Sequence, residues 1–182
     1  MSRMLKFGQP LGGVMQIAHI VDDLEAGAAK WVEALNIGPW VILEHFQADN
    51  TTYYGEPTNI DLSIALAYSG SMCFELVQQN NDVPSVYKDQ IAQSGLGAFH
   101  HWGVCTETFD EDLAAYKRKD MPIAFAGNVR AVGGLRFAYI DAMASARGMI
   151  ELIECAPVVE DLFNSIKEQA EAWDGKTVFI RP

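Results

Sequence analysis

Two glutamates lie inside otherwise apolar segments that have the composition of buried strands. Glu75 lies in the run 72–77, and Glu151 lies in the run 149–153. Burying an unpaired carboxylate costs several kcal/mol, so each glutamate needs a cation, a hydrogen-bonding network or exposure to water. The two segments match residue by residue, with Phe-Glu-Leu-Val aligned on Ile-Glu-Leu-Ile. This recurrence favours a shared function over two unrelated surface positions.

Gln16 and His101 form a second matched pair, each near the beginning of an apolar segment. Together with the two glutamates they offer one imidazole nitrogen and three oxygen ligands. That donor set suits Zn²⁺, Mn²⁺, Ni²⁺, Co²⁺ or Fe²⁺. The four side chains could converge where two related sheets meet, and the sequence therefore predicts a candidate divalent-metal site.

The segments that would position these residues follow a repeated order, which begins with a strand and a helix. The mostly apolar stretch 14–21 predicts a strand, and Asp22-Asp23 can cap a helix whose apolar residues recur from Leu24 to Leu35. Three further strands are predicted at 40–46, 62–68 and 71–77.

The second half of the chain has the same order. A short apolar strand is predicted at 99–105 and a helix at about 109–119, ended by Met121-Pro122. Three strands then follow at 123–129, 135–141 and 148–153.

We test this internal repeat by aligning the first half of the chain with the second at a fixed offset of 85 residues. It places Gln16 on His101 and Trp31 on Tyr116, whereas a shift of 76 residues places Glu75 on Glu151. Loops between strands readily absorb the difference. We therefore expect two copies of one βαβββ module.

The expected organisation is a single α+β domain over residues 1–182. Its modules span 13–80 and 98–156, joined by a polar linker at 81–97. The stretch 158–173 has helical spacing, so 157–182 is expected to form a C-terminal helix and tail outside the repeat.

Composition and charge exclude several classes of function. With 24 acidic and 13 basic residues the net charge is −11, which repels phosphate backbones and anionic lipid. The chain has no apolar run of membrane-spanning length and no signal-peptide pattern, so we expect a cytoplasmic protein that binds neither nucleic acid nor membrane. The three cysteines are widely spaced in apolar runs and predict reduced thiols.

The order of these motifs resembles the vicinal oxygen chelate superfamily, which includes glyoxalase I, methylmalonyl-CoA epimerase, extradiol dioxygenases and bleomycin-resistance proteins. The resemblance covers nearly all of residues 13–156. Its motifs are the opening Gln16-Ile-Ala-His-Ile-Val-Asp-Asp-Leu-Glu, the strand Phe74-Glu75-Leu76, the stretch Gly97-Ala-Phe-His-His101-Trp-Gly-Val and the strand Met149-Ile-Glu151-Leu-Ile.

The resemblance implies a glyoxalase-like fold, with paired open sheets around a divalent ion. It implies Gln16, Glu75, His101 and Glu151 as the ligands of Zn, Ni, Co or Mn, with Fe less well matched. It also implies an isomerase, epimerase or lyase that moves a proton next to a carbonyl, with Glu151 as the base and Glu75 as the second candidate. A homodimer is expected because members of the superfamily often pair.

The resemblance leaves the small-molecule substrate open between an acyl-CoA, a glutathione adduct and a hydrophobic ketone. Gln16 resembles some glyoxalase I enzymes, whereas the Gly-x-x-His-His stretch resembles the epimerases. The candidates for holding an anionic substrate are Arg130, Arg136, Arg147 and the run 117–119. Aromatic residues that could line an apolar pocket, or belong to the core, are Trp40, Phe46, Tyr53, Tyr54 and Trp102.

Two other functions compete with the isomerase. A metal-free binding or resistance protein would keep the fold, but it would have no need for buried carboxylates. A ring-cleaving dioxygenase would need a histidine where Gln16 stands, and His19 could supply it only through a β-bulge. His100 is expected to face away from His101 as a packed or hydrogen-bonded histidine, and His45 to lie at the surface or against a pocket.

Overall fold

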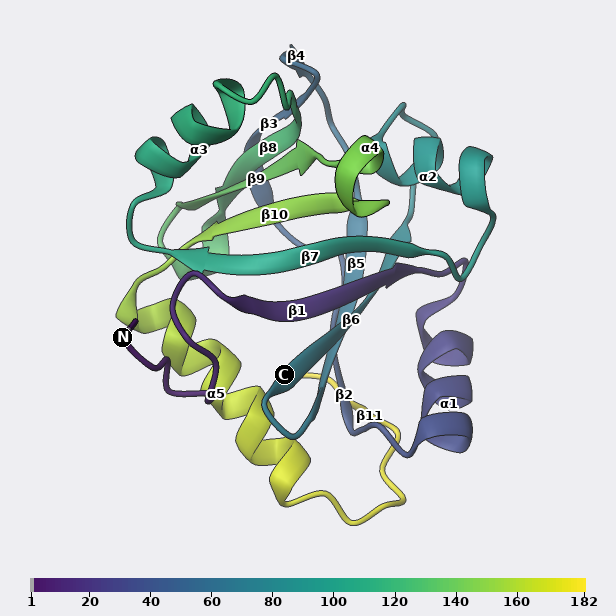
Figure 1. Cartoon of the computed structure of the whole chain (residues 1–182). Coiled ribbons are helices and arrows are strands. Elements are labelled where there is room, and N and C mark those ends of the chain that lie inside the picture. The colour runs from purple at the N-terminus through teal and green to yellow at the C-terminus, as the bar shows by residue number, and fades with distance from the viewer. Residues whose placement is uncertain (1) are drawn as a thin grey trace.

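The computed structural model of the protein describes residues 2–182 and has one 11-stranded sheet with helices packed against both of its faces (Figure 1). The strand order is β11-β2-β5-β6-β1-β7-β10-β9-β8-β3-β4. This arrangement confirms the predicted α+β class and glyoxalase-like architecture.

Each half of the sheet is built from one βαβββ set. The first contains β1 (Val14–Ile20), α1 (Leu24–Leu35), β2 (Trp40–Leu43), β5 (Leu62–Ser69) and β6 (Met72–Gln79). The second contains β7 (Phe99–Thr106), α3 (Phe109–Lys117), β8 (Ile123–Val129), β9 (Leu135–Asp141) and β10 (Met149–Glu154).

The two halves join through the antiparallel pair β1 and β7, which lie side by side in the middle of the sheet (Figure 1). On either side the pairing is parallel: Ala18 of β1 lies opposite Glu75 of β6, and His101 of β7 lies opposite Met149 of β10. These four neighbouring strands carry all four of the candidate ligands.

The pairing of β1 with β7 contains a β-bulge. Ala18 pairs with His101 and the next residue, His19, pairs with Phe99, so His100 is an extra residue on β7. A bulge redirects the side chains around it. Side chains on this part of β7 therefore do not alternate strictly between the two faces of the sheet, as the sequence analysis had assumed.

The sequence did not predict the hairpin of β3 (Ala48–Tyr53) and β4 (Glu56–Pro57), which leaves the first half and crosses to the second. β3 pairs with β8, and Ala48 lies opposite Val129. The segment is mostly polar and lacks the alternation that marks a half-buried strand. Pairing with a distant edge strand, rather than local propensity, makes it a strand.

The polar segment 81–97 joins the two halves as a linker, and it contains a helix that the sequence did not predict, α2 (Val86–Ser94). The Ser85 side chain caps α2 by accepting a hydrogen bond from the Lys88 amide at 3.1 Å. Val86 and Tyr87 are buried in its first turn, although the remainder of the helix is largely polar. A single apolar turn is too short to show helical periodicity in sequence.

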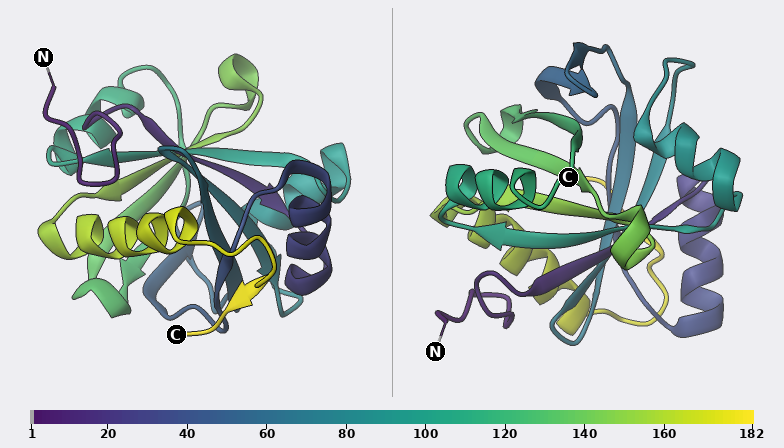
Figure 2. Two further views of the ribbon diagram at one scale, coloured as in Figure 1. Left: turned by 90° about the horizontal axis from the view of Figure 1, so that it is seen from below. Right: turned by 45° about the horizontal axis from the view of Figure 1, so that its top comes forward.

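The C-terminal helix α5 (Pro157–Glu171) lies across the lower side of the molecule, as Figure 2 shows from below. Its buried residues Val159, Phe163 and Ile166 belong to the large inner core between the sheet and α5. Two smaller cores lie beneath α1 and α3 on the outer face. The remaining elements are η1 (Arg130–Val132), α4 (Met143–Ala146) and β11 (Phe179–Ile180), which pairs with β2.

The three cysteines, Cys73, Cys105 and Cys155, are free thiols, as expected. Within residues 2–182, every helix is too short or too polar to cross a lipid bilayer.

Candidate metal centre

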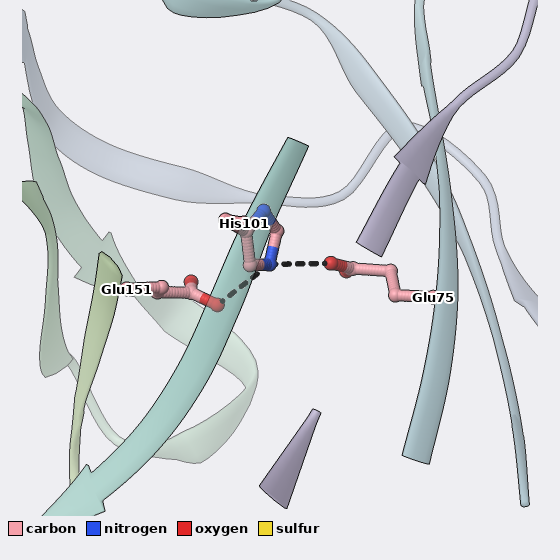
Figure 3. Close-up of side chains that lie close together, drawn as sticks. All are labelled: Glu75, His101 and Glu151. Atoms are coloured by element: carbon pink, nitrogen blue, oxygen red, sulfur yellow. Dashed lines mark ion pairs between the residues drawn. The ribbon is translucent and has the colours of Figure 1, made fainter. Parts of the chain in front are cut away.

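Three buried side chains from adjacent parts of the sheet meet at the centre of the molecule. Glu75 of β6 and Glu151 of β10 point toward each other from opposite sides of His101 on β7 (Figure 3). The His101 Nε2 atom lies 3.1 Å from Glu75 Oε2 and 3.2 Å from Glu151 Oε2. In residues 2–182 this is the one group of three acidic, histidine or cysteine residues close enough to hold a metal ion.

Gln16 of β1 completes the group. Its side-chain amide donates a hydrogen bond to Glu75 Oε2 at 2.7 Å, and the residue is buried. Space for this side chain exists because residue 103 is glycine: a Cβ there would lie 2.7 Å from the Gln16 Cβ. The structure thus brings together the four residues that the sequence singles out.

Burial and charge have opposing effects on the ionisation of this group. Burial lowers the pKa of His101, but the carboxylates of Glu151 and Glu75 outweigh that effect and raise the pKa to about 9. Burial raises the pKa of Glu75, while the positive charge of His101 and the hydrogen bond from Gln16 oppose the rise. The two carboxylates therefore favour a cation between them, which can be a proton on His101 or a metal ion.

The unpaired atoms of the site fit a metal. Gln16 Oε1 and His101 Nε2 are both buried without a hydrogen-bond partner of normal geometry. Such atoms are costly unless something binds them. Imidazole nitrogen and carboxylate or amide oxygen are ligands that borderline divalent ions accept. The donor set and its unpaired atoms could therefore hold a metal ion.

His100 contacts His101 directly, so the expectation that it faces away was wrong. The two Nδ1 atoms are 2.9 Å apart, and the His100 ring stacks on Tyr87 of α2 with centroids 4.6 Å apart. Burial, with a further contribution from His101, holds the pKa of His100 well below its ordinary value. His100 is therefore neutral and can accept the Nδ1–H of His101. The β-bulge on β7 is the cause of this placement.

The other two histidines lie away from the centre. His19 packs against Trp31 and Phe99 on the opposite face of the sheet. This placement is as expected, because the extra residue of the bulge lies on β7 and not on β1. His45 lies at the surface, where its Nδ1 is 2.9 Å from Asp61 Oδ1.

A cavity with two lobes opens onto the glutamates. One, which we call the hairpin lobe, is lined by Ala48, Ile60, Leu62, Tyr87, Phe125 and Tyr139. The other, which we call the helix lobe, is lined by residues that include Leu43, Leu66, Ile153, Val159, Leu162 and Phe163. Both lobes share Phe46, Ile64, Val129, Phe137 and the two carboxylates of Glu75 and Glu151.

Of the five aromatic residues proposed from sequence to line a pocket, Phe46 lines both lobes. Trp40 is buried in the core beneath α1, and Trp102 lies on the outer face of the sheet. Tyr53 donates a hydrogen bond to Asp89, and Tyr54 is exposed. The other aromatic residues of the hairpin lobe lie on α2, β8 and β9. The sequence carries no signal for them, because Phe125 and Tyr139 each lie between two apolar neighbours.

The basic residues proposed to hold an anion lie outside both lobes. Arg130 forms an ion pair with Asp49, and Arg136 forms ion pairs with Asp110 and Glu154. Residues 117–119 end and follow α3 on the outside, and Arg147 follows α4. The structure therefore brings none of these cations to the two glutamates.

Comparison with known proteins shows the family. The sequence model of the Glyoxalase/Bleomycin resistance protein/Dioxygenase superfamily matches residues 15–139. The chain belongs to this superfamily. A comparison with curated proteins gave no match.

Solved structures share the fold at low sequence identity. A hypothetical protein from Bacillus halodurans is 18% identical with a TM-score of 0.55, and the alignment covers 79% of this chain and 94% of that one. Methylmalonyl-CoA epimerase from Mycobacterium tuberculosis is 15% identical with a TM-score of 0.55, at 88% and 96% coverage. A methylmalonyl-CoA epimerase in complex with methylmalonyl-CoA and NH₄⁺ is 18% identical with a TM-score of 0.53, at 81% and 97% coverage.

Proposed function

We propose that the protein is a divalent-metal-dependent enzyme that moves a proton on a carbon next to a carbonyl, as an epimerase or an isomerase or lyase of the glyoxalase I type. The observation that carries this proposal is the buried contact of His101 Nε2 with Glu75 and Glu151 at the floor of a cavity. Gln16, Glu75, His101 and Glu151 would hold Zn, Ni, Co or Mn. When bound, such an ion polarises a carbonyl and stabilises negative charge on its oxygen.

Glu151 is the proposed base. Glu75 accepts a hydrogen bond from Gln16, which fixes that carboxylate and favours its charged form. Glu151 lines the cavity as Glu75 does but accepts no such amide hydrogen bond, so it is the freer of the two to reach a substrate. Its carboxylate accepts the proton from the carbon while the C–H electron pair moves toward the carbonyl oxygen, and the same proton can return to carbon.

Glu75 is the second candidate base, because epimerisation needs proton transfer on both faces of the carbon. It lies on the other side of His101 from Glu151, which is the placement that two opposing bases require. The proposed substrate is a small molecule: an acyl-CoA, a glutathione adduct or a hydrophobic ketone. Solved epimerases of similar fold are seen in complex with methylmalonyl-CoA or 2-nitronate-propionyl-CoA, which supports the acyl-CoA class.

Elemental analysis of untagged protein purified without chelators tests the proposal first, with wild type and Glu151→Gln compared. We expect close to one divalent ion per wild-type chain, a lower content in the variant, and deuterium exchange next to the substrate carbonyl in wild type alone. Bound iron together with oxygen consumption would favour the dioxygenase instead. Absence of metal, with no rise in melting temperature on adding divalent ions, would leave a metal-free binding protein.

The predicted homodimer and cytoplasmic location remain predictions. Light scattering of the purified protein measures the mass of the particle, and a value near 20.1 kDa would contradict pairing. Fractionation of cells that express the full chain tests the location.

A further inference from the structure

The reactive carboxylates lie at the junction of two pockets. Glu75 and Glu151 line both the hairpin lobe and the helix lobe, and Phe46 also borders both. A molecule whose reacting carbon lies at the glutamates can therefore extend in two directions. A substrate with its carbonyl at one end would fill one lobe and leave the other without apolar contacts.

Apart from the site residues, both lobes are lined almost entirely by hydrocarbon. The hydroxyls of Tyr87 and Tyr139 are the additional side-chain polar groups of the hairpin lobe, and they bond to each other at 3.2 Å. The helix lobe adds only Gln16, whose amide is already held by Glu75. Burial of a charged substituent in such a lobe would cost several kcal/mol, because nothing there replaces its water.

The entrance beside the helix lobe offers no free cation. Its residues include Arg181, which forms ion pairs with Glu25 and Glu44. Arg130 lies next to this entrance but is paired with Asp49. The phosphates of coenzyme A and the carboxylates of glutathione need unpaired basic groups. Among residues 2–182, the entrance supplies only basic side chains that are already neutralised.

The size of the lobes limits the substituents. They enclose about 60 and 80 Å³. A water-sized group needs roughly 10–15 Å³ on this scale, so the hairpin lobe holds about four to six such groups and the helix lobe about five to eight. That space accommodates a short alkyl chain or one small ring on each side of the carbonyl.

We propose that the natural substrate is an uncharged internal ketone or α-hydroxyketone with a hydrophobic substituent on each side of the reacting centre. The inference rests on the proposed proton transfer and selects one of its substrate classes. The absence of charge on this substrate agrees with the site. One divalent ion would cancel the charge of the two carboxylates and leave no net charge to attract an anion.

The test uses 5-hydroxyoctan-4-one, which has a propyl group on each side of its hydroxyketone. The matched control is the same molecule with one terminal methyl replaced by a carboxylate, and methylmalonyl-CoA is the second comparison. Titration calorimetry on the metal-loaded protein measures binding, and proton NMR in deuterium oxide measures exchange at the carbinol carbon. We expect the neutral hydroxyketone to bind at least ~10-fold more tightly than its carboxylate analogue, because the lobes cannot solvate a charge.

Two variants are designed to reverse the preference for the neutral hydroxyketone over its carboxylate analogue, and each changes one lobe. Ile60→Arg places a cation in the hairpin lobe, and Leu162→Arg places one in the helix lobe. Both positions are half-buried, so the arginine can reach water in the absence of a ligand. We expect each variant to bind the neutral hydroxyketone more weakly and the carboxylate analogue more tightly than wild type does.

The outcomes separate this inference from the function on which it rests. Binding of the neutral hydroxyketone without exchange would support the substrate class and contradict the proton transfer. Exchange on methylmalonyl-CoA without binding of the hydroxyketone would overturn the substrate class and support the proton transfer. Failure of the neutral compound to bind, or a preference for the carboxylate analogue in wild type, overturns the inference.

Discussion

The Nδ1 atom of His100 lies 2.9 Å from the Nδ1 atom of His101, and both rings are fully buried. Because His100 is neutral, the shared proton belongs to His101 and points at the His100 lone pair. With its proton on Nδ1, the His101 ring presents its other nitrogen, Nε2, to Glu75 and Glu151. His100 is thus a positioning residue, which fixes the ring whose other nitrogen is the candidate ligand.

His100→Ala is expected to weaken metal binding by about 10- to 100-fold, the effect of removing a hydrogen-bond partner of a metal-bound histidine. Competition with a chromogenic chelator measures this affinity. His100→Asn, which keeps an acceptor on a shorter side chain, is expected to recover part of the loss. His19→Ala is the matched control, because His19 lies on the opposite face of the sheet and should leave metal affinity unchanged.

Gly103 is expected to be essential for the position of Gln16. In Gly103→Ala the new methyl group would lie 2.7 Å from the Gln16 Cβ, so the β1 and β7 backbones or the Gln16 side chain must move. We expect a loss of about 1–3 kcal/mol in the free energy of unfolding of the metal-free protein, typical of overpacking. Urea unfolding with a chelator present measures it. A variant as stable as wild type would show that the strands adjust freely.

The α5 helix is expected to hold the helix lobe closed. Phe163 is buried there and its ring lies 5.5 Å from that of Phe7. Phe163→Ala should lower the free energy of unfolding by about 3–5 kcal/mol and enlarge the lobe. Val158→Ala, on the exposed side of the same helix, is the control and should change stability by less than about 0.5 kcal/mol. Equal stabilities of the two variants would contradict the packing role of α5.

The repeat made the main elements predictable. Matching Gln16 with His101 and Glu75 with Glu151 gave the strands that carry the four residues, and each begins within one residue of its predicted start. The helical spacing of α1 is clear because one face of this helix is buried, whereas β5 is buried on both faces and is marked in the sequence by a continuous apolar run. The convergence of the four side chains follows from the topology of the family, which the motifs indicated.

The parts that the sequence did not predict depend on contacts between distant residues. β3 is a strand because its backbone pairs with β8, and the turn of α2 that carries Tyr87 is buried by the second half of the chain. The bulge at His100 arises from the register between β1 and β7. A strict period of two cannot show such an extra residue, so its contact with His101 was not predicted.

The pKa of His101 predicts opposite pH dependences for the metal-free and metal-loaded protein. In the metal-free fold the carboxylates raise the pKa of His101 from 6.5 to about 9. A raised pKa means that the folded state binds the proton more tightly than the unfolded state. The resulting stability, of order 3 kcal/mol, is fully present below pH 6.5 and is lost as the pH rises through 9.

Metal reverses this sign, because a ligating His101 must be neutral in the folded state while the unfolded chain still takes up the proton. Stability of the loaded protein should therefore rise with pH through 6.5. Urea unfolding at pH 6 and pH 9.5, with a chelator and with excess zinc, measures both slopes. His101→Gln removes the titrating group and is expected to abolish most of the fall seen with chelator. Equal slopes with chelator and with zinc would contradict the placement of the ion at His101.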